Sequence, residues 1–291
     1  NHARVYGLLP EVELTAVFDQ NQARAREVAD EFGCEVAGSL AELAERCQAV
    51  SVAVPTVAHL AVGRELMDAG ADILVEKPIA TTGAEAAELV AHAQSLGRVL
   101  QVGHIERFNP VLRQLEEKLT RPRFIEAHRL SPFPNRSTDI GVVLDLMIHD
   151  LEIILHLVNS PLATMDAVGV PVLTKYEDIA NVRLRFENGC VANVTASRIS
   201  PERMRKIRVF QEDCYLSLDY QGQEGQMYYK DATGIAQVDV EVEKDEPLKL
   251  QLAAFRDAVR ERREPTVTGR EGAAALEVAL EITKSIQSQN G

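Results

Sequence analysis

A lysine follows one of the most apolar runs of the sequence and is suited to act on a reacting oxygen. The run Ile73-Leu74-Val75 predicts a buried strand, and Glu76-Lys77-Pro78 follows it directly. A lysine offers several N–H donors, and its pKa shifts readily on burial, so that it can bind or share a proton. We therefore take Lys77 as a candidate catalytic residue with Glu76 beside it.

Asp145 and His149 form a second candidate pair within a strongly helical segment, Val142 to Val158. Residues four apart lie on one face of a helix, so Asp145 can hydrogen-bond an imidazole nitrogen of His149, fix its tautomer and stabilise the imidazolium. This arrangement predicts a general base for a hydroxyl proton. The alternative is an ordinary solvated helix face.

The same helix offers a rival interpretation, because Asp145, His149, Glu152 and His156 follow steps of four, three and four residues. Such a polar stripe could ligate a metal, which would favour a metal-dependent hydrolase. A single helix rarely supplies a complete metal site, and no second cluster with ligand spacing occurs in the sequence. We therefore expect acid–base chemistry and no metal.

Further polar residues follow other predicted strands. Asp19 comes after Leu14 to Phe18, where an acidic residue can accept hydrogen bonds from a dinucleotide ribose, although a helix-capping Asp is as common. Pro55 and Thr56, with His59 nearby, follow the strand that ends at Val54. Proline and threonine also suit any strand-to-helix turn.

The elements that must position these residues alternate regularly up to Val102. Continuous apolar strands that alternate with helices predict a parallel sheet buried on both faces, with ligands beyond the carboxyl ends of its strands. The predicted strands are 14–18, about 36, 49–54, 73–75 and 99–102, and the predicted helices are 21–32, 40–46, 59–69 and 84–96.

After Val102 the pattern changes to closely spaced strands with short turns, which predicts a largely antiparallel sheet. We expect an α/β protein with a Rossmann-type domain at 1–103 and a substrate-binding and oligomerisation domain at 104–291. The predicted strands are 124–128, 168–173, 180–186, 191–197, 206–210, 215–218 and 238–242, and the predicted helices are 110–118, 142–158, 248–261 and 272–287. A sheet covered by helices on one side leaves an apolar open face that prefers burial, and we expect the chain to form homodimers or homotetramers through it.

Several arginines are weaker candidates. Arg107 could contact a substrate or a cofactor phosphate, although Asn109 and Pro110 make this stretch an ordinary helix start. Arg198, Arg203 and Arg205 lie near strand ends, and we expect them to be solvated surface charges.

Composition excludes several classes of protein. With 31 Lys+Arg against 44 Asp+Glu, the net charge of −13 disfavours nucleic acid and anionic membranes. The four cysteines are far apart and form no metal-binding pattern, which favours a reducing cytoplasm. No apolar run approaches the length of a membrane span.

Four motifs in this order resemble the Gfo/Idh/MocA oxidoreductases, the relatives of glucose-fructose oxidoreductase and inositol dehydrogenase. They are Pro55-Thr56 with His59, Glu76-Lys77-Pro78, residues 103–110 (GHIERFNP) and residues 141–150 (GVVLDLMIHD). The resemblance covers nearly the whole chain, and the last two motifs look most like the sugar-nucleotide branch.

The resemblance implies NAD(P)-dependent oxidation or reduction of a hydroxyl or ketone of a sugar, polyol or sugar nucleotide. It implies that Lys77, Asp145 and His149 are catalytic and that NAD is favoured over NADP because of Asp19. The implied cofactor-binding residues are Asp19, Pro55, Thr56, His59, Glu76, Lys77 and Arg107.

The beginning of the sequence departs from the family pattern. Family members open with a strand and a Gly-rich loop, and residues 1–10 instead resemble the helix that follows that loop. The first strand and loop are either truncated or lost, and we favour truncation because the other strand-end residues are intact. Loss of the loop would favour a dinucleotide-binding sensor or scaffold without turnover.

Overall fold

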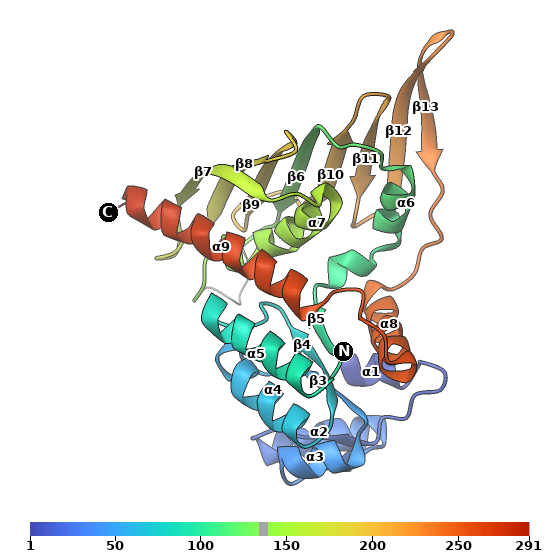
Figure 1. Ribbon diagram of the computed structural model, residues 1–291, viewed down its shortest axis with the longest axis vertical. Coiled ribbons are helices and arrows are strands. Elements are labelled where there is room, and N and C mark those ends of the chain that lie inside the picture. The colour runs from blue at the N-terminus through green and yellow to red at the C-terminus, as the bar shows by residue number, and fades with distance from the viewer. Residues whose placement is uncertain (134–138, 291) are drawn as a thin grey trace. The chain divides into compact units, whose positions relative to one another are not determined.

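The computed structural model describes residues 1–133 and 139–290, and these form two compact units (Figure 1). Unit 1 contains Asn1–Ile105 and Glu246–Ala273, and unit 2 contains Glu106–Asp245 and the chain from Ala274 onward. Each unit has its own apolar core, so each is described by itself.

The unit boundaries differ from the predicted division at Gly103, which assigned every later residue to the second domain. The segment Glu246–Ala273 belongs to unit 1. The reason is packing, because Leu252 and Phe255 of this segment share one buried cluster with Val5 and Leu74. Sequence order alone does not reveal that a late helix completes an early core.

Unit 1 alternates short parallel strands with helices, as predicted. Its strands pair in parallel, β1 with β2 and β4 with both β3 and β5. Ile73 and Leu74 in β4 are fully buried, because Gly63 of α4 lies against Ile73 and α8 packs with Leu74. The elements are α1 (His2–Tyr6), β1 (Ala16–Val17), α2 (Gln22–Phe32), β2 (Glu35–Val36), α3 (Leu40–Arg46), β3 (Ala49–Val52), η1 (Thr56–Ala58), α4 (His59–Asp68), β4 (Asp72–Glu76), α5 (Gly83–Ser95), β5 (Leu100–Gly103) and α8 (Pro247–Glu261).

The parallel strands of unit 1 form two sheets. Within the described residues, β1–β2 is one sheet and β3–β4–β5 is another, and β1 does not pair with β3. A groove of about 1260 Å³ is lined by residues 11–18 on the β1 side and by residues 43–51 on the β3 side. The α/β fold was predicted correctly, but this separation of the sheet was not.

Unit 2 is built on a mixed sheet whose described strands number eight, in the order β13-β12-β11-β10-β6-β9-β8-β7. All neighbours are antiparallel except β6 and β9. Residues of α6, α7 and α9 share one core with the buried side of the sheet (Figure 1). The elements are η2 (Ile105–Phe108), α6 (Pro110–Lys118), β6 (Phe124–Leu130), η3 (Val143–Met147), α7 (Ile148–Val158), β7 (Leu162–Val170), β8 (Ile179–Phe186), β9 (Val191–Ser197), β10 (Met204–Phe210), β11 (Cys214–Asp219), β12 (Glu224–Asp231), β13 (Gly234–Val240) and α9 (Gly269–Asn290), whose first residues belong to unit 1.

Local sequence signals explain most element boundaries. The Asn21 side chain accepts hydrogen bonds from the first turn of α2, and Gly33 ends that helix in the left-handed conformation with φ of 69°. Asn109 and Pro110 begin α6 in the same way. In β8 the buried and exposed residues alternate, which is the pattern of a strand with one covered face.

Two parts of the sheet were predicted poorly. β12 was missed, because the apolar run in its sequence, EGQMYYKD, is short and most of its residues are partly exposed. β7 spans Leu162–Val170 rather than 168–173, since exposed Thr and Asp residues hide the alternation of its first half. In the described part of the chain, no helix is long and apolar enough to cross a membrane.

Candidate functional site

The carboxyl ends of three parallel strands meet at one edge of unit 1. The register pairs Val52 with Val75 and Glu76 with Gly103, so β3, β4 and β5 end at neighbouring positions. Pro55 and Thr56 follow β3, and Lys77 follows β4. The structure therefore brings these predicted residues to the same edge.

His59 connects two of the loops at this edge from inside the unit. Its side chain is buried, with Nδ1 3.0 Å from the carbonyl oxygen of Pro78 and Nε2 3.0 Å from that of Val54. Carbonyl oxygens only accept hydrogen bonds and a neutral imidazole carries one N–H, so the ring donates to one of the two oxygens and lies close to the other. His59 thus ties the turn that carries Lys77 to the end of β3, which is a positioning role.

Glu76 and Lys77 are half-buried at the end of β4. The Glu76 carboxylate lies 3.1 Å from His2 and accepts a hydrogen bond from the Lys77 backbone N–H at 3.3 Å. It also packs against the backbone of Gly103, where a Cβ would lie 2.9 Å from the carboxylate. Glycine at this position leaves room for the acidic side chain.

Asp19 is exposed at the carboxyl end of β1, and one of its oxygens accepts a hydrogen bond from the Asn21 N–H at 2.8 Å. The helix cap itself is Asn21. Asp19 therefore stabilises the turn before α2 without being its cap, and its carboxylate remains at the surface of unit 1.

In unit 2, Asp145 and His149 lie on consecutive helical segments. The predicted single helix consists of the π-helix η3, which contains Asp145, and α7, of which His149 is the second residue. The Asp145 N–H donates to the Gly141 carbonyl at 3.1 Å, and both side chains are half-buried. A π-helical turn inside a helix frequently marks a functional site.

The residues that follow His149 on α7 belong to a buried network of charges. The Arg129 guanidinium donates to both carboxylate oxygens of Asp150, at 2.7 and 2.9 Å, and to Glu106 at 2.9 Å. Burial alone would lower the pKa of Arg129, but Asp150 and Glu106 outweigh it and raise this pKa above its usual range. The network fixes α7 against β6.

Arg107 contributes a second buried pair to α7. Its Nη1 donates to Glu152 Oε1 at 2.6 Å, and both side chains are almost completely buried. This contact gives Arg107 a structural role in unit 2, and its contact with a cofactor remains a prediction.

The side chains of the proposed metal stripe have separate partners, since His156 pairs with Glu116 at 3.0 Å. Over the ranges that the structure describes, no group of three His, Cys, Asp or Glu side chains could hold a metal.

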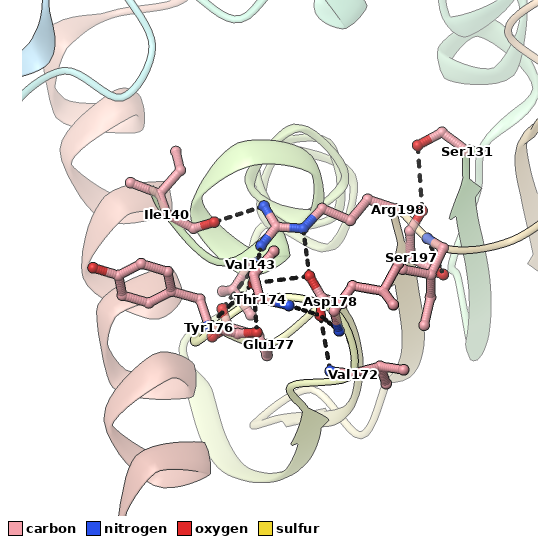
Figure 2. Close-up of polar contacts among 12 residues, drawn as sticks. Ser131, Ile140, Val143, Val172, Thr174, Tyr176, Glu177, Asp178, Ser197 and Arg198 are labelled. Carbon is pink, nitrogen blue, oxygen red and sulfur yellow. Dashed lines mark hydrogen bonds and ion pairs between the residues drawn. The ribbon is translucent and has the colours of Figure 1, made fainter. Parts of the chain in front are cut away.

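Arg198 corrects an expectation, because it is fully buried rather than solvated. Figure 2 shows its polar contacts. Its Nε donates to Asp178 Oδ1 at 2.8 Å, and neither side chain is exposed. Sequence reasoning missed Glu177 and Asp178, which precede β8. The available signal was the adjacent acidic pair just before the predicted strand 180–186. Arg203 is exposed as predicted, and the half-exposed Arg205 lies 3.3 Å from Glu106.

Comparison with known proteins gives matches over both units. Residues 1–104 match the oxidoreductase family with an NAD-binding Rossmann fold, and residues 113–217 match the GFO/IDH/MocA C-terminal domain. The chain is 35% identical over 294 residues to UDP-N-acetylglucosamine 3-dehydrogenase of Acidithiobacillus ferrooxidans, covering 99% of this chain and 93% of that protein. The chain belongs to the Gfo/Idh/MocA family.

Other Gfo/Idh/MocA relatives extend the comparison. The solved structure of the same Acidithiobacillus enzyme aligns with a TM-score of 0.94 over 99% of this chain and 93% of that one. The scyllo-inositol 2-dehydrogenase (NAD(+)) of Bacillus subtilis is 24% identical, covering 96% of this chain and 88% of its own length. A levoglucosan dehydrogenase solved with NADH and levoglucosan shares the fold, with a TM-score of 0.88 at 17% identity, over 99% of this chain and 94% of that one.

As a Gfo/Idh/MocA member the chain is an NAD-binding oxidoreductase, and the residues at the edge of unit 1 fit this cofactor. The exposed Asp19 carboxylate has the chemistry to accept hydrogen bonds from ribose hydroxyls, and Thr56 and Lys77 supply donors. Gly103 leaves space that a Cβ would take from the Glu76 carboxylate. The polar groups that follow β1, β3 and β4 are therefore suited to a dinucleotide.

Proposed function

We propose that this NAD-dependent oxidoreductase acts on a secondary hydroxyl of a sugar nucleotide, or on the corresponding ketone in reverse. The observation that carries the substrate class is the 35% identity over nearly the full length to an enzyme named for UDP-N-acetylglucosamine. More distant relatives are named for inositols, so simple polyols are the competing substrates.

Lys77, Asp145 and His149 are the proposed catalytic residues. In the oxidative direction the imidazole of His149 takes the proton of the hydroxyl, and Asp145 orients the ring and stabilises the imidazolium. The Lys77 ammonium donates a hydrogen bond to the reacting oxygen and stabilises the charge that develops there. Bound NAD supplies the acceptor for the hydride that leaves the carbon.

Turnover by single variants tests these roles. Lys77→Ala and His149→Ala are expected to lose about 10²–10⁴-fold in kcat with UDP-N-acetylglucosamine, because each removes a group that acts on the reacting proton or oxygen. The measurement is the absorbance of reduced nicotinamide with UDP-sugars and with myo-inositol. Lys230→Ala on β12 and His92→Ala on α5 are the matched controls and should keep wild-type rates.

Each outcome of this experiment is informative. A Lys77→Ala enzyme with wild-type kcat would refute the role of the lysine. Binding of NADH without turnover of any tested sugar or polyol would favour the sensor alternative. Turnover of myo-inositol in preference to every UDP-sugar would overturn the substrate class while leaving the roles of Lys77 and His149 open to the same variants.

We also infer that the chain forms a homo-oligomer through the open face of the unit 2 sheet. An aromatic ladder across four neighbouring strands supports this. Phe210 stacks on Tyr215 and Tyr215 on Tyr228, with centroid distances of 4.8 and 4.6 Å, and the tilted ring of Phe124 lies 5.6 Å from that of Phe210. Val168 and Val170 on β7 are 53% and 47% exposed. The middle of the face is polar, unlike the apolar face that was expected, because Asn181 and Thr195 hydrogen-bond there.

Light scattering on a sizing column tests the oligomer. The wild type should elute with the mass of a dimer or tetramer, and Tyr215→Asp should shift the mass towards the monomer because a charge in the ladder would be buried without a partner. The control is Tyr229→Asp. Tyr229 lies on β12 opposite Cys214 of β11 and is not part of the ladder. A monomeric wild type at micromolar concentration would refute the proposal.

A further inference from the structure

The backbone that leads into the helix with Asp145 is held by residues from a distant part of unit 2 (Figure 2). The Ile140 carbonyl accepts a hydrogen bond from Arg198 Nη1 at 2.7 Å. The Val142 N–H donates to the Glu177 carbonyl at 3.0 Å, and the Val143 N–H donates to Glu177 Oε1 at 3.4 Å. These three contacts fix the start of η3, and we call Glu177 and Arg198 the clamp.

The clamp is itself rigidly supported. Arg198 donates to Asp178 through Nε and to the Thr174 hydroxyl through Nη2, both at 2.8 Å. Asp178 Oδ2 in turn accepts the backbone N–H groups of residues 172, 173 and 174 at 2.6–2.9 Å. Burial alone would raise the pKa of Asp178, but the N–H donors of Leu173 and Thr174 and the Arg198 guanidinium hold it well below its usual range.

Glu177 is buried and lies directly against Gly141. A Cβ on Gly141 would be 1.8 Å from Glu177 Oε1, so only glycine allows the carboxylate to lie here. The Gly141 carbonyl then accepts the hydrogen bond from the Asp145 N–H. One route of contacts from Glu177 to Asp145 therefore passes through Gly141, beside the hydrogen bonds at Val142 and Val143.

The position of the carboxylate also has an electrostatic effect. The first N–H groups of a helix have no partner within the helix and carry partial positive charge, which an acidic side chain at this end satisfies. Glu177 supplies that acceptor at Val143 although it lies 34 residues away in the sequence. Without it, the first turn before Asp145 would lose its fixed partner.

We propose that Glu177 and Arg198 are positioning residues that hold Asp145, and through the same helix His149, in the geometry needed for proton transfer. This inference rests on the catalytic roles proposed above for Asp145 and His149. The two clamp residues act on the backbone of residues 140–143 and are not assigned any contact with substrate or cofactor.

Steady-state kinetics of matched variants provide the first test. Glu177→Ala is expected to lower kcat by about 10²-fold, the effect of a misplacement near 1 Å, while KM for NAD changes less than about twofold. Glu177→Gln should restore most of the activity, because its amide oxygen can still accept from the Val143 N–H. Glu212→Ala, which removes an exposed ion pair with Arg123 outside the strands, is the control and should match the wild type.

A double-mutant cycle tests the link through Gly141. Gly141→Ala should be nearly as damaging as Glu177→Ala, because the added methyl displaces the carboxylate. In the Gly141→Ala/Glu177→Ala protein the clash is absent, so kcat should equal that of Glu177→Ala rather than the product of the two losses. Multiplicative losses would show that the two residues act independently and would overturn the inference.

Hydrogen exchange provides a measurement that does not need turnover. In Glu177→Ala the amides of Val143 and Asp145 should exchange about tenfold faster than in the wild type, while those of β8 and β9 keep their rates.

If Glu177→Ala does not fold, Arg198→Lys carries the same test, because the lysine keeps the charge beside Asp178 but does not reach the Ile140 carbonyl. Unchanged exchange at residues 143–145 would refute the clamp. Absence of turnover in the wild type would refute the proposed function instead, and the exchange data would still decide whether the clamp exists.

Discussion

The two units hold their candidate site residues by different kinds of contact. In unit 1, Lys77 is placed by the register of parallel strands and by His59, which bridges the carbonyls of Val54 and Pro78. In unit 2, the helix with Asp145 and His149 is held by fully buried charged pairs. These are Asp178–Arg198, Asp150–Arg129 and Glu152–Arg107.

This difference determines how each region should respond to change. A hydrogen bond between neutral groups contributes modestly, and its loss leaves at most an unsatisfied polar group. A buried ion pair that loses one member leaves an uncompensated charge in the interior, which costs several times more. The site region of unit 2 is therefore expected to be the more sensitive of the two, and its stability should depend on pH.

The largest expected effect comes from breaking the Asp178–Arg198 pair. Asp178→Ala should lower the free energy of unfolding of unit 2 by about 3–5 kcal/mol, because the fully buried Arg198 loses its counter-charge. Urea unfolding followed by tyrosine fluorescence measures this, since every tyrosine except Tyr6 lies in unit 2 and the chain has no tryptophan.

A matched variant separates this loss from a general effect of removing an aspartate. Asp213 is exposed between β10 and β11, and Asp213→Ala should change the unfolding free energy by less than about 0.5 kcal/mol. Equal losses of unfolding free energy in the two variants would show that the buried ion pair contributes no more than a surface aspartate. The contrast between the two units would then disappear.

The pH dependence of unfolding sharpens the same comparison. The pKa of Asp178 is depressed in the folded protein, so its contribution is complete above the unfolded value near 4 and is lost as the pH falls towards the folded value. The stability difference between the wild type and Asp178→Asn should therefore be largest near neutral pH and narrow steadily below about pH 4. Urea unfolding of both proteins at several pH values tests this. A stability difference that does not change with pH would contradict the depressed pKa of Asp178.

Sequence reasoning succeeded where local pattern determines structure. The alternation of apolar strands and helices predicted the parallel strands of unit 1, and the strand ends then placed Pro55, Thr56, Glu76 and Lys77 at one edge. Helix α6 and strand β9 were predicted with the bounds that the structure has, because cap residues and alternation are local signals.

Sequence reasoning failed where a structural contact joins residues that are distant in the sequence. Nothing near Arg198 in the sequence indicates that Asp178, 20 residues earlier, will accept its charge in the interior. The same holds for Glu177, whose carboxylate reaches Val143, and for α8, which returns to the core of unit 1. The π-helical turn at Asp145 was likewise not predicted, because an α-helical period was assumed throughout residues 142–158.

The smallest expected effect is at the bridge made by His59 in unit 1. His59→Ala removes the ring that contacts the part-buried carbonyls of Val54 and Pro78, and a carbonyl left unsatisfied costs about 1–3 kcal/mol. Water that enters the space left by the ring would satisfy part of this, so we expect a loss near the lower limit, together with a higher KM for NAD because the turn with Lys77 is less fixed. Faster hydrogen exchange in β4, compared with His92→Ala on the surface of α5, would measure the effect. A loss as large as that of Asp178→Ala would show that neutral and charged contacts support the two regions equally, and would end the comparison.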